Sequence, residues 1–323
     1  MLLATTLLIL LSTGHCGDGA EPAARADWVA GLHEHHPRTR LVDLVLPGTH
    51  DSGSHAITRT SASAPGKPEL YASFGALTAA WARTQERSIA EQLAEGIRYL
   101  DLRVARHEGK LVLVHGLVSR ELAGALEEVR LFAHDHPREP VLLDFQAMPT
   151  AAAHGELDEH VQHALADHLF ESSAPLGEWT LASLWSSSRN LIAIFDHSGF
   201  AARRATYLAR GVLDSVWTDA RTLDTLRERL DARIRSRAPD RLQCAYLTFT
   251  PNLETIVSDP ICARRGLEGM SKPLFDLPGR WITRWLDSGL RPNVISVDFY
   301  DRTDVVAAAM AANRRLLNAG QGR

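Results

Sequence analysis

The sequence has no excess of charge of one sign and no apolar opening long enough to cross a membrane. Its 35 Lys and Arg residues nearly balance 39 Asp and Glu residues, which gives a net charge of −4 at pH 7. This balance lacks the basic footprint of a nucleic-acid-binding protein, and the ordinary apolar content does not indicate disorder. The opening segment has about ten apolar residues, whereas a mature spanning helix needs roughly 20. We therefore expect a folded protein with no nucleic-acid partner.

Cysteine is scarce, since Cys16, Cys244 and Cys262 are the three in the chain. Cys16 raises the alternative of a lipoprotein, although His15 before it fits a lipidation motif poorly. If a leader that contains Cys16 is removed, Cys244 and Cys262 remain. In an exported protein these two either close a short loop as a disulfide or stay as thiols. The sequence leaves both alternatives open because a disulfide depends on side-chain geometry.

The N-terminal segment has the apolar run of a secretory leader. Small residues follow the run, and Ala24-Arg25-Ala26 suits cleavage by a signal peptidase. No Lys or Arg precedes the run, and a buried N-terminal helix is the alternative interpretation. We expect residues 1–26 to be a signal peptide and the mature protein to be secreted.

The rest of the chain shows no repeat, low-complexity tract or linker that would divide it. Strands are expected at residues 41–46, 96–104, 111–115, 140–145, 190–195, 212–217, 242–250 and 294–299. Helices are expected from residue 27 onward and at 87–95, 119–135, 157–170, 222–235, 281–286 and 303–317. This alternation indicates an α/β protein. We expect residues 27–323 to form a single irregular (β/α) TIM-like barrel, and the protein to be a monomer.

Two histidines and an arginine follow or end the expected strands. His50 follows the first apolar run and the turn Pro47-Gly48, and Asp51 comes next to it. Arg103 ends a second run, and His115 ends a third. In barrels of parallel strands the C-terminal strand ends carry the chemistry.

These residue types suit the cleavage of a phosphodiester. Two imidazoles serve the two proton transfers, and an arginine fork neutralises the phosphate oxygens. The chain has 15 histidines, so most of them have no catalytic role. His50 and His115 stand out because an apolar strand delivers each and a glycine follows within three residues.

The order of these motifs resembles the phosphatidylinositol-specific phospholipase C X-domain family. The motifs are LPGTHDSG at 46–53, SIAEQL at 88–93, GIRYLDLRV at 96–104 and LVHG at 113–116. A weaker likeness extends to VISVDFY at 294–300. The likeness is greatest to the metal-independent bacterial and X-domain-only members. It implies a TIM-like barrel that cleaves a phospholipid to diacylglycerol and a cyclic or open head-group phosphate.

The resemblance also implies roles for the site residues. His50 is the general base, His115 is the general acid and Arg103 holds the phosphate. Asp51 supports the acid and the arginine, and Asp101 matches a further carboxylate of the motif.

Asp298 matches the carboxylate that fixes the tautomer of the base. A strand-end cap or a surface carboxylate is the alternative for Asp298.

The resemblance to the metal-independent members of the family implies that the enzyme needs no metal and no cofactor. Calcium-dependent members place an acid where this chain has Arg103, and a cation there would repel a divalent ion. The alternative takes Asp51 and Asp101 as metal ligands.

The head-group pocket of the bacterial members does not carry over. The stretch Asp144-Phe145-Gln146 stands where they have a lysine, and the stretch at Trp217 has no clear counterpart of their sugar-binding pair. We expect Gln146 and Trp217 to contact the substrate. A different head group, or binding without turnover, are the alternatives to cleavage of an inositol phospholipid.

The expected substrate lies at a membrane surface. Residues 58–74, rich in Ser, Thr, Pro and Gly at their start, are placed to form the rim of the barrel. Trp81 and Trp217 are either interfacial anchors or core residues.

Overall fold

The computed structural model describes residues 25–73, 75–146, 150–215, 217–251 and 260–321. Eight parallel strands form an α/β barrel in the order β7-β6-β5-β2-β1-β10-β9-β8. Their bounds are β1 Leu46–Thr49, β2 Tyr99–His107, β5 Val141–Gln146, β6 Leu191–Phe195, β7 Tyr207–Ala209, β8 Leu213–Asp214, β9 Leu242–Leu247 and β10 Val294–Val297. Within the described residues β7 and β8 make no ladder with each other, so the barrel is open at that seam. The predicted irregular TIM-like barrel is confirmed.

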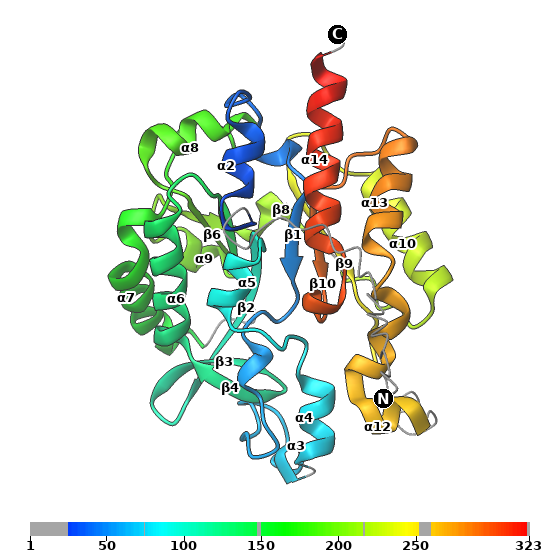
Figure 1. The fold of residues 1–323 in the computed structure, drawn as a ribbon. Coiled ribbons are helices and arrows are strands. Elements are labelled where there is room, and N and C mark those ends of the chain that lie inside the picture. Colours follow the sequence, from blue (N-terminus) through cyan, green and yellow to red (C-terminus); the bar gives the residue numbers. More distant parts are fainter. Residues whose placement is uncertain (1–24, 74, 147–149, 216, 252–259, 322–323) are drawn as a thin grey trace, which may run out of the picture.

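Helices flank the strands on both sides. Figure 1 shows α6 and α7 along one side and α10, α13 and α14 along the other. The bounds of the helices are α2 Trp28–His33, α3 Leu70–Ser73, α4 Ala76–Ala82, α5 Ile89–Ala94, α6 Leu122–Asp135, α7 His154–Leu165, α8 Leu181–Ser187, α9 Ser198–Ala201, α10 Leu223–Arg235, α12 Pro260–Ser271, α13 Pro278–Asp287 and α14 Val305–Gln321. None of these described helices has both the length and the apolar character to span a membrane.

The first strand differs from its prediction. Residues 41–46 were expected to be extended, but Leu41–Asp43 form a 3₁₀ turn and the strand is Leu46–Thr49. The Pro-Gly pair therefore lies inside the strand. A side chain on Gly48 would come within 2.8 Å of the Tyr99 ring, so glycine lets β1 and β2 pack closely here.

The strand at 111–115 lies outside the barrel. β3 (Lys110–His115) pairs antiparallel with the far half of β2 and with β4 (Leu117–Glu121). Antiparallel partners need only a tight connection, and Glu108 and Gly109, both at positive φ, provide it. The hairpin projects beyond one end of the barrel, beside α3 and α4 (Figure 1). It carries His115 back toward the strand ends.

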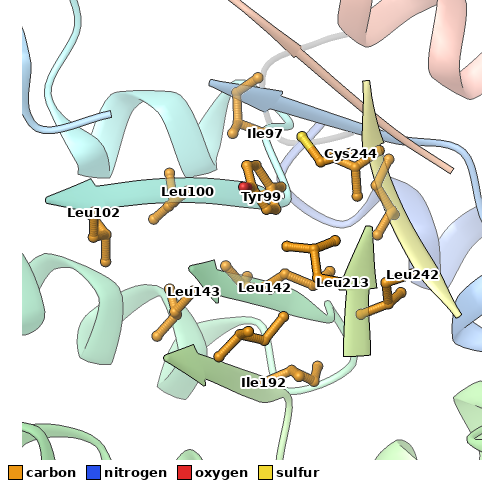
Figure 2. Packing of buried hydrophobic residues seen from close by; sticks show 14 of the residues in the cluster. Ile97, Tyr99, Leu100, Leu102, Leu142, Leu143, Ile192, Leu213, Leu242 and Cys244 are labelled. Carbon is orange, nitrogen blue, oxygen red and sulfur yellow. The ribbon is translucent and has the colours of Figure 1, made fainter. Parts of the chain in front are cut away.

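Apolar side chains fill the barrel. Figure 2 shows Tyr99, Leu142, Leu213 and Leu242, from four different strands, converging in the interior. Cys244 on β9 is a free thiol that is only 4% exposed, and burial raises its pKa well above the ordinary value. The disulfide considered for Cys244 is therefore not formed. The side chain of Cys262 lies outside the described part.

The predicted signal peptide lies almost wholly outside the described residues, as does Cys16. Its last two residues, Arg25 and Ala26, are described, and their carbonyls accept hydrogen bonds from the buried Arg98 at 3.3 and 2.5 Å. The backbone at 25–26 is thus part of the folded structure.

Candidate active site

The C-terminal strand ends and the β3–β4 hairpin bring six predicted residues together. They are His50 and Asp51 after β1, Asp101 and Arg103 on β2, His115 at the end of β3, and Asp298 after β10. All but Arg103 and His115 are at least nine-tenths buried. The side chains of Arg103 and His115 are each 25% exposed, so they form the accessible side of the cluster.

His50 lies between two carboxylates. Its Nδ1 is 2.8 Å from Asp298 Oδ1, and its Nε2 is 2.9 Å from Asp51 Oδ2. Burial alone would lower the pKa of His50, but Asp51 and Asp298 outweigh it and raise the pKa to about 10. Arg103 lies beside Nε2, whereas Asp298 contacts Nδ1. Because a carboxylate can only accept a hydrogen bond, Asp298 favours a proton on Nδ1.

Asp51 contacts every basic group of the site. Its Oδ2 is also 3.0 Å from His115 Nε2, and its Oδ1 is 2.8 Å from Arg103 Nε. Burial opposes its ionisation, but Arg103, His115 and His50 hold the pKa of Asp51 well below its ordinary value. Asp51 has φ 44°, in the left-handed region. Such a conformation is often found at functional sites.

Arg103 carries the permanent charge of the cluster. Its Nη2 lies 3.0 Å from His50 Nε2 and 3.4 Å from Asp101 Oδ2. Burial works against the charge, but Asp51 and Asp101 raise the pKa of Arg103 above its ordinary value. The fork is therefore fixed at the exposed side, where an anion can reach it.

His115 has a different environment from His50. Its Nδ1 donates to the carbonyl of Ala82 at 2.7 Å, which leaves Nε2 facing Asp51. Burial lowers the pKa of His115, and the positive charges of Arg103 and His50 lower it further. The negative charge of Asp51 raises this pKa, but not enough to cancel the other effects. The surroundings thus favour the protonated form of His50 and the neutral form of His115.

Two polar residues that the sequence analysis missed hold the backbone of His50. Gln85 Nε2 donates to the carbonyls of His50 and Val297 at 3.0 and 2.9 Å. Thr84 Oγ1 donates to the carbonyl of His50 at 2.9 Å. Both side chains are fully buried. Their signal in the sequence is weak, because an uncharged polar pair ahead of a helix is more often on the surface.

Gln146 belongs to a buried polar group beside the histidines. Its Nε2 donates to Asp144 Oδ2 at 2.9 Å and to Tyr246 Oη at 2.8 Å. Tyr99 Oη donates to the same Asp144 oxygen at 2.7 Å, and Arg210 Nη2 is 3.6 Å from it. Burial raises the pKa of Asp144 to about 7, although Arg210 opposes the shift. The sequence predicts a site role for Gln146 but gives no signal for these partners.

Trp217 packs on the site itself. Its indole lies 4.9 Å from the His50 ring and 5.1 Å from the Tyr246 ring, between centroids. Trp81, by contrast, is 9% exposed and belongs to the core, so the core alternative is right for Trp81.

Three of these residues also have a possible metal-ligand arrangement. Ligand atoms of His50, Asp51 and His115 lie within 4.8 Å of one another, the one such group in the described part of the chain. Two imidazoles and a carboxylate are ligands that zinc accepts. However, the guanidinium of Arg103 contacts both His50 and Asp51, and its charge opposes a cation at that point. Asp101, the other ligand considered, is instead paired with Arg103.

A family model matches the central part of the chain. Residues 76–194 match the model described as the X domain of phosphatidylinositol-specific phospholipase C. This span contains Asp101, Arg103 and His115. The resemblance predicted from the motifs is confirmed.

Relatives of similar length are named for the same domain. PI-PLC X domain-containing protein 2 of Mus musculus is 27% identical, over 91% of this chain and 89% of its own. PI-PLC X domain-containing protein 3 of Homo sapiens is 26% identical, over 89% of this chain and 93% of its own. The similarity therefore extends beyond the span of the family model to nearly the whole chain.

Solved bacterial structures share the fold. The phosphatidylinositol-specific phospholipase C of Listeria monocytogenes superposes with a TM-score of 0.63 at 14% identity, covering 89% of this chain and 98% of that one. A mutant form of the Staphylococcus aureus enzyme gives the same TM-score and identity, over 90% and 98%. At this identity the likeness establishes the barrel and nothing finer.

Proposed function

Because the chain is similar to the X domain of phosphatidylinositol-specific phospholipase C over residues 76–194, we propose that it belongs to that family and is a phosphodiesterase that cleaves a phospholipid. The products are diacylglycerol and a cyclic head-group phosphate. The single observation that carries this proposal is the contact of Asp51 Oδ2 with Nε2 of both His50 and His115, at 2.9 and 3.0 Å, beside Arg103. The two proposed proton carriers and the proposed phosphate clamp thus meet at one carboxylate.

In the first step a head-group hydroxyl next to the phosphate gives its proton to Nε2 of His50. Its oxygen attacks phosphorus, and the bond from phosphorus to the diacylglycerol oxygen breaks. His115 gives its Nε2 proton to that leaving oxygen. Arg103 neutralises the charge that develops on the phosphate oxygens. Water opens the cyclic product later, with the two histidines in exchanged roles.

The proton count of the site agrees with this sequence of steps. In this proposal the free site holds one catalytic proton, and the contacts of His50 with Asp51 and Asp298, which raise its pKa, favour that proton on His50. The reacting form carries the same number of protons but has His115 protonated. Since Asp51 Oδ2 contacts both Nε2 atoms, the two forms differ only in which ring nitrogen holds that proton.

We further propose that the protein acts as a secreted monomer at a membrane surface and needs no metal. Support for the membrane comes from the lipid substrate of the proposed reaction. Among the structural neighbours, the Staphylococcus aureus enzyme binds membranes. Support for metal independence comes from Arg103, which supplies the positive charge that an ion would otherwise bring.

The identity of the head group is the second level of the proposal. An inositol phospholipid is the leading candidate. A different head group with a neighbouring hydroxyl is favoured by one observation, the replacement of the expected lysine by Gln146, which is bonded to Asp144 and Tyr246. Binding without turnover is disfavoured because a binder has no need for two proton carriers.

An assay of purified protein on a panel of labelled phospholipids, with and without EDTA, tests the proposal. We expect release of diacylglycerol from at least one lipid whose head group has a hydroxyl next to the phosphate, with EDTA present. A His50→Ala variant serves as the inactive control. Tight lipid binding without any product would contradict the proposal and favour the binding alternative.

A further inference from the structure

We propose that Trp217 is a positioning residue that holds the His50 ring and stabilises its protonated form, rather than a residue that binds the head group. This inference rests on the proposed function only in naming His50 as a proton carrier. Its test measures His50 directly and does not depend on activity.

The indole of Trp217 is fixed against His50. The two ring centroids are 4.9 Å apart with an interplanar angle of 38°, closer to stacked than to edge-on. Trp217 Nε1 donates to Thr250 Oγ1 at 2.7 Å, which holds the indole in this orientation. A protonated imidazole within about 6 Å of an indole is attracted by the negative face of the ring system.

A second aromatic ring supports the same arrangement. Tyr246 lies 5.9 Å from the His50 ring at 78° and 5.1 Å from Trp217. Its hydroxyl lies 3.1 Å from Tyr99 Oη and accepts a hydrogen bond from Gln146 Nε2 at 2.8 Å. Because Tyr246 is held in this way, Trp217 is fixed between Thr250 and a rigid neighbour.

The charged and titratable groups that face His50 come from several elements. Asp51 and Asp298 meet its nitrogens, Arg103 and His115 lie beside Nε2, Tyr246 faces it from β9, and Asp101 acts through Arg103. The carboxylates act at the ring edge. Trp217 contributes through the ring face, so its effect is separable from theirs.

The sign of the effect distinguishes this role from simple burial. An apolar cover excludes water and therefore lowers the pKa of an imidazole, whereas a cation–π contact raises it. Trp217→Leu keeps an apolar cover and removes the aromatic face. The proposal predicts that this change lowers the pKa of His50, and a covering role predicts no change or a rise.

The experiment is an NMR titration of labelled histidine in the whole protein, with the His50 signals identified by their loss in His50→Gln. We expect Trp217→Leu to lower the His50 pKa by about one unit. Trp217→Phe, which keeps an aromatic face, should lower it by less. Trp185→Leu is the matched control, because Trp185 lies over Arg138 and donates to its carbonyl, away from the site. An unchanged or raised His50 pKa in Trp217→Leu would overturn the proposal.

A second variant covers the case in which Trp217→Leu does not fold. Thr250→Val removes the acceptor of the indole N–H and should lower the His50 pKa by a smaller amount. The activity profile gives an independent reading, since the alkaline limb of kcat/KM should move down with the His50 pKa. If His50→Gln retains activity, the proposed function fails while the titration still decides the role of Trp217.

Discussion

Two arginines five positions apart, Arg98 and Arg103, show how an enclosed structural ion pair differs from an ion pair at the candidate active site. Arg98 is fully buried against Glu139, with Nη2 to Oε2 at 2.8 Å. Its remaining donors reach the carbonyls of Leu93, Ile97, Arg25 and Ala26. Glu139 in turn accepts from the amides of Val29 and Ala30. Every partner is internal, so the pair ties α2 to the barrel.

Arg103 has the opposite arrangement. It faces two carboxylates and an imidazole, yet a quarter of its side chain remains exposed. Burial lowers the pKa of Arg98, whereas Asp51 and Asp101 overcome burial and raise the pKa of Arg103. The contrast indicates that the Arg98 cluster is complete by itself, while the Arg103 cluster has an open side for an anion.

The largest expected effect on turnover comes from removing the two histidines that contact the Arg103 cluster, His50 and His115. His50→Ala and His115→Ala should each lower turnover by about a hundredfold to ten-thousandfold, because each removes one acid–base group. Thermal unfolding should stay cooperative. Steady-state assays on the best lipid substrate measure the loss, with His163→Ala on the exposed face of α7 as control. Near-wild-type turnover in both variants would remove the proposed mechanism.

The same substitution at both arginines sharpens the comparison. Arg103→Lys keeps the charge but loses the planar fork, so kcat should fall by about a hundredfold with little change in stability. Arg98→Lys leaves buried carbonyls without donors and should lower the free energy of unfolding by roughly 1–3 kcal/mol. Its kcat per folded molecule should stay near that of the wild type. Denaturant unfolding and active-site-normalised kinetics measure the two effects, and equal effects at both positions would contradict the comparison.

A change of pH should alter kcat/KM gradually, and less than the histidine and arginine substitutions do. The reacting form needs one proton on the histidine pair, so kcat/KM should fall above the His50 pKa of about 10, where the last proton is lost. The rate constant kcat/KM should also fall on the acid side, where the pair gains a second proton on His115. Because burial lowers the pKa of His115, this acid limb should lie below the ordinary histidine pKa. A broad plateau through neutral pH is expected. A single limb centred near pH 7 would show that the two histidines do not share a proton.

The smallest expected effect is that of metal removal. Activity should survive excess EDTA, because Arg103 supplies the charge at the phosphate. Assays on chelator-treated protein, with calcium or zinc added back, measure this directly. Restoration by an ion of a chelator-silenced enzyme would favour the metal-ligand arrangement of His50, Asp51 and His115.

The sequence predicted the parts of the site that lie in short motifs at strand ends. His50, Asp51, Arg103 and His115 meet because apolar strands deliver them to one end of the barrel. Asp298 reaches His50 from 248 positions away, and only its family motif indicated that contact.

The remaining features depend on contacts that no local pattern encodes. Gln85 bonds to Val297 across 212 positions and Gln146 to Tyr246 across 100. The hairpin of β3 was not predicted, because an apolar run indicates a strand but does not distinguish a parallel from an antiparallel one. The strand predicted at 41–46 was misplaced, because Leu41–Asp43 form a 3₁₀ turn. The amide of Leu44 donates to the carbonyl of Leu41, and the amide of Leu41 donates to the distant carbonyl of Trp179.

The central claim is that a hydroxyl of the substrate itself, activated by His50, attacks phosphorus. Attack within one molecule is favoured by proximity, so the first product should be a five-membered cyclic phosphodiester together with diacylglycerol. Phosphorus NMR at short reaction times, on the lipid that the panel identifies, measures this most directly. The account predicts the cyclic signal first and the open phosphomonoester only later. An open phosphomonoester from the earliest time point, with no cyclic signal, would contradict it.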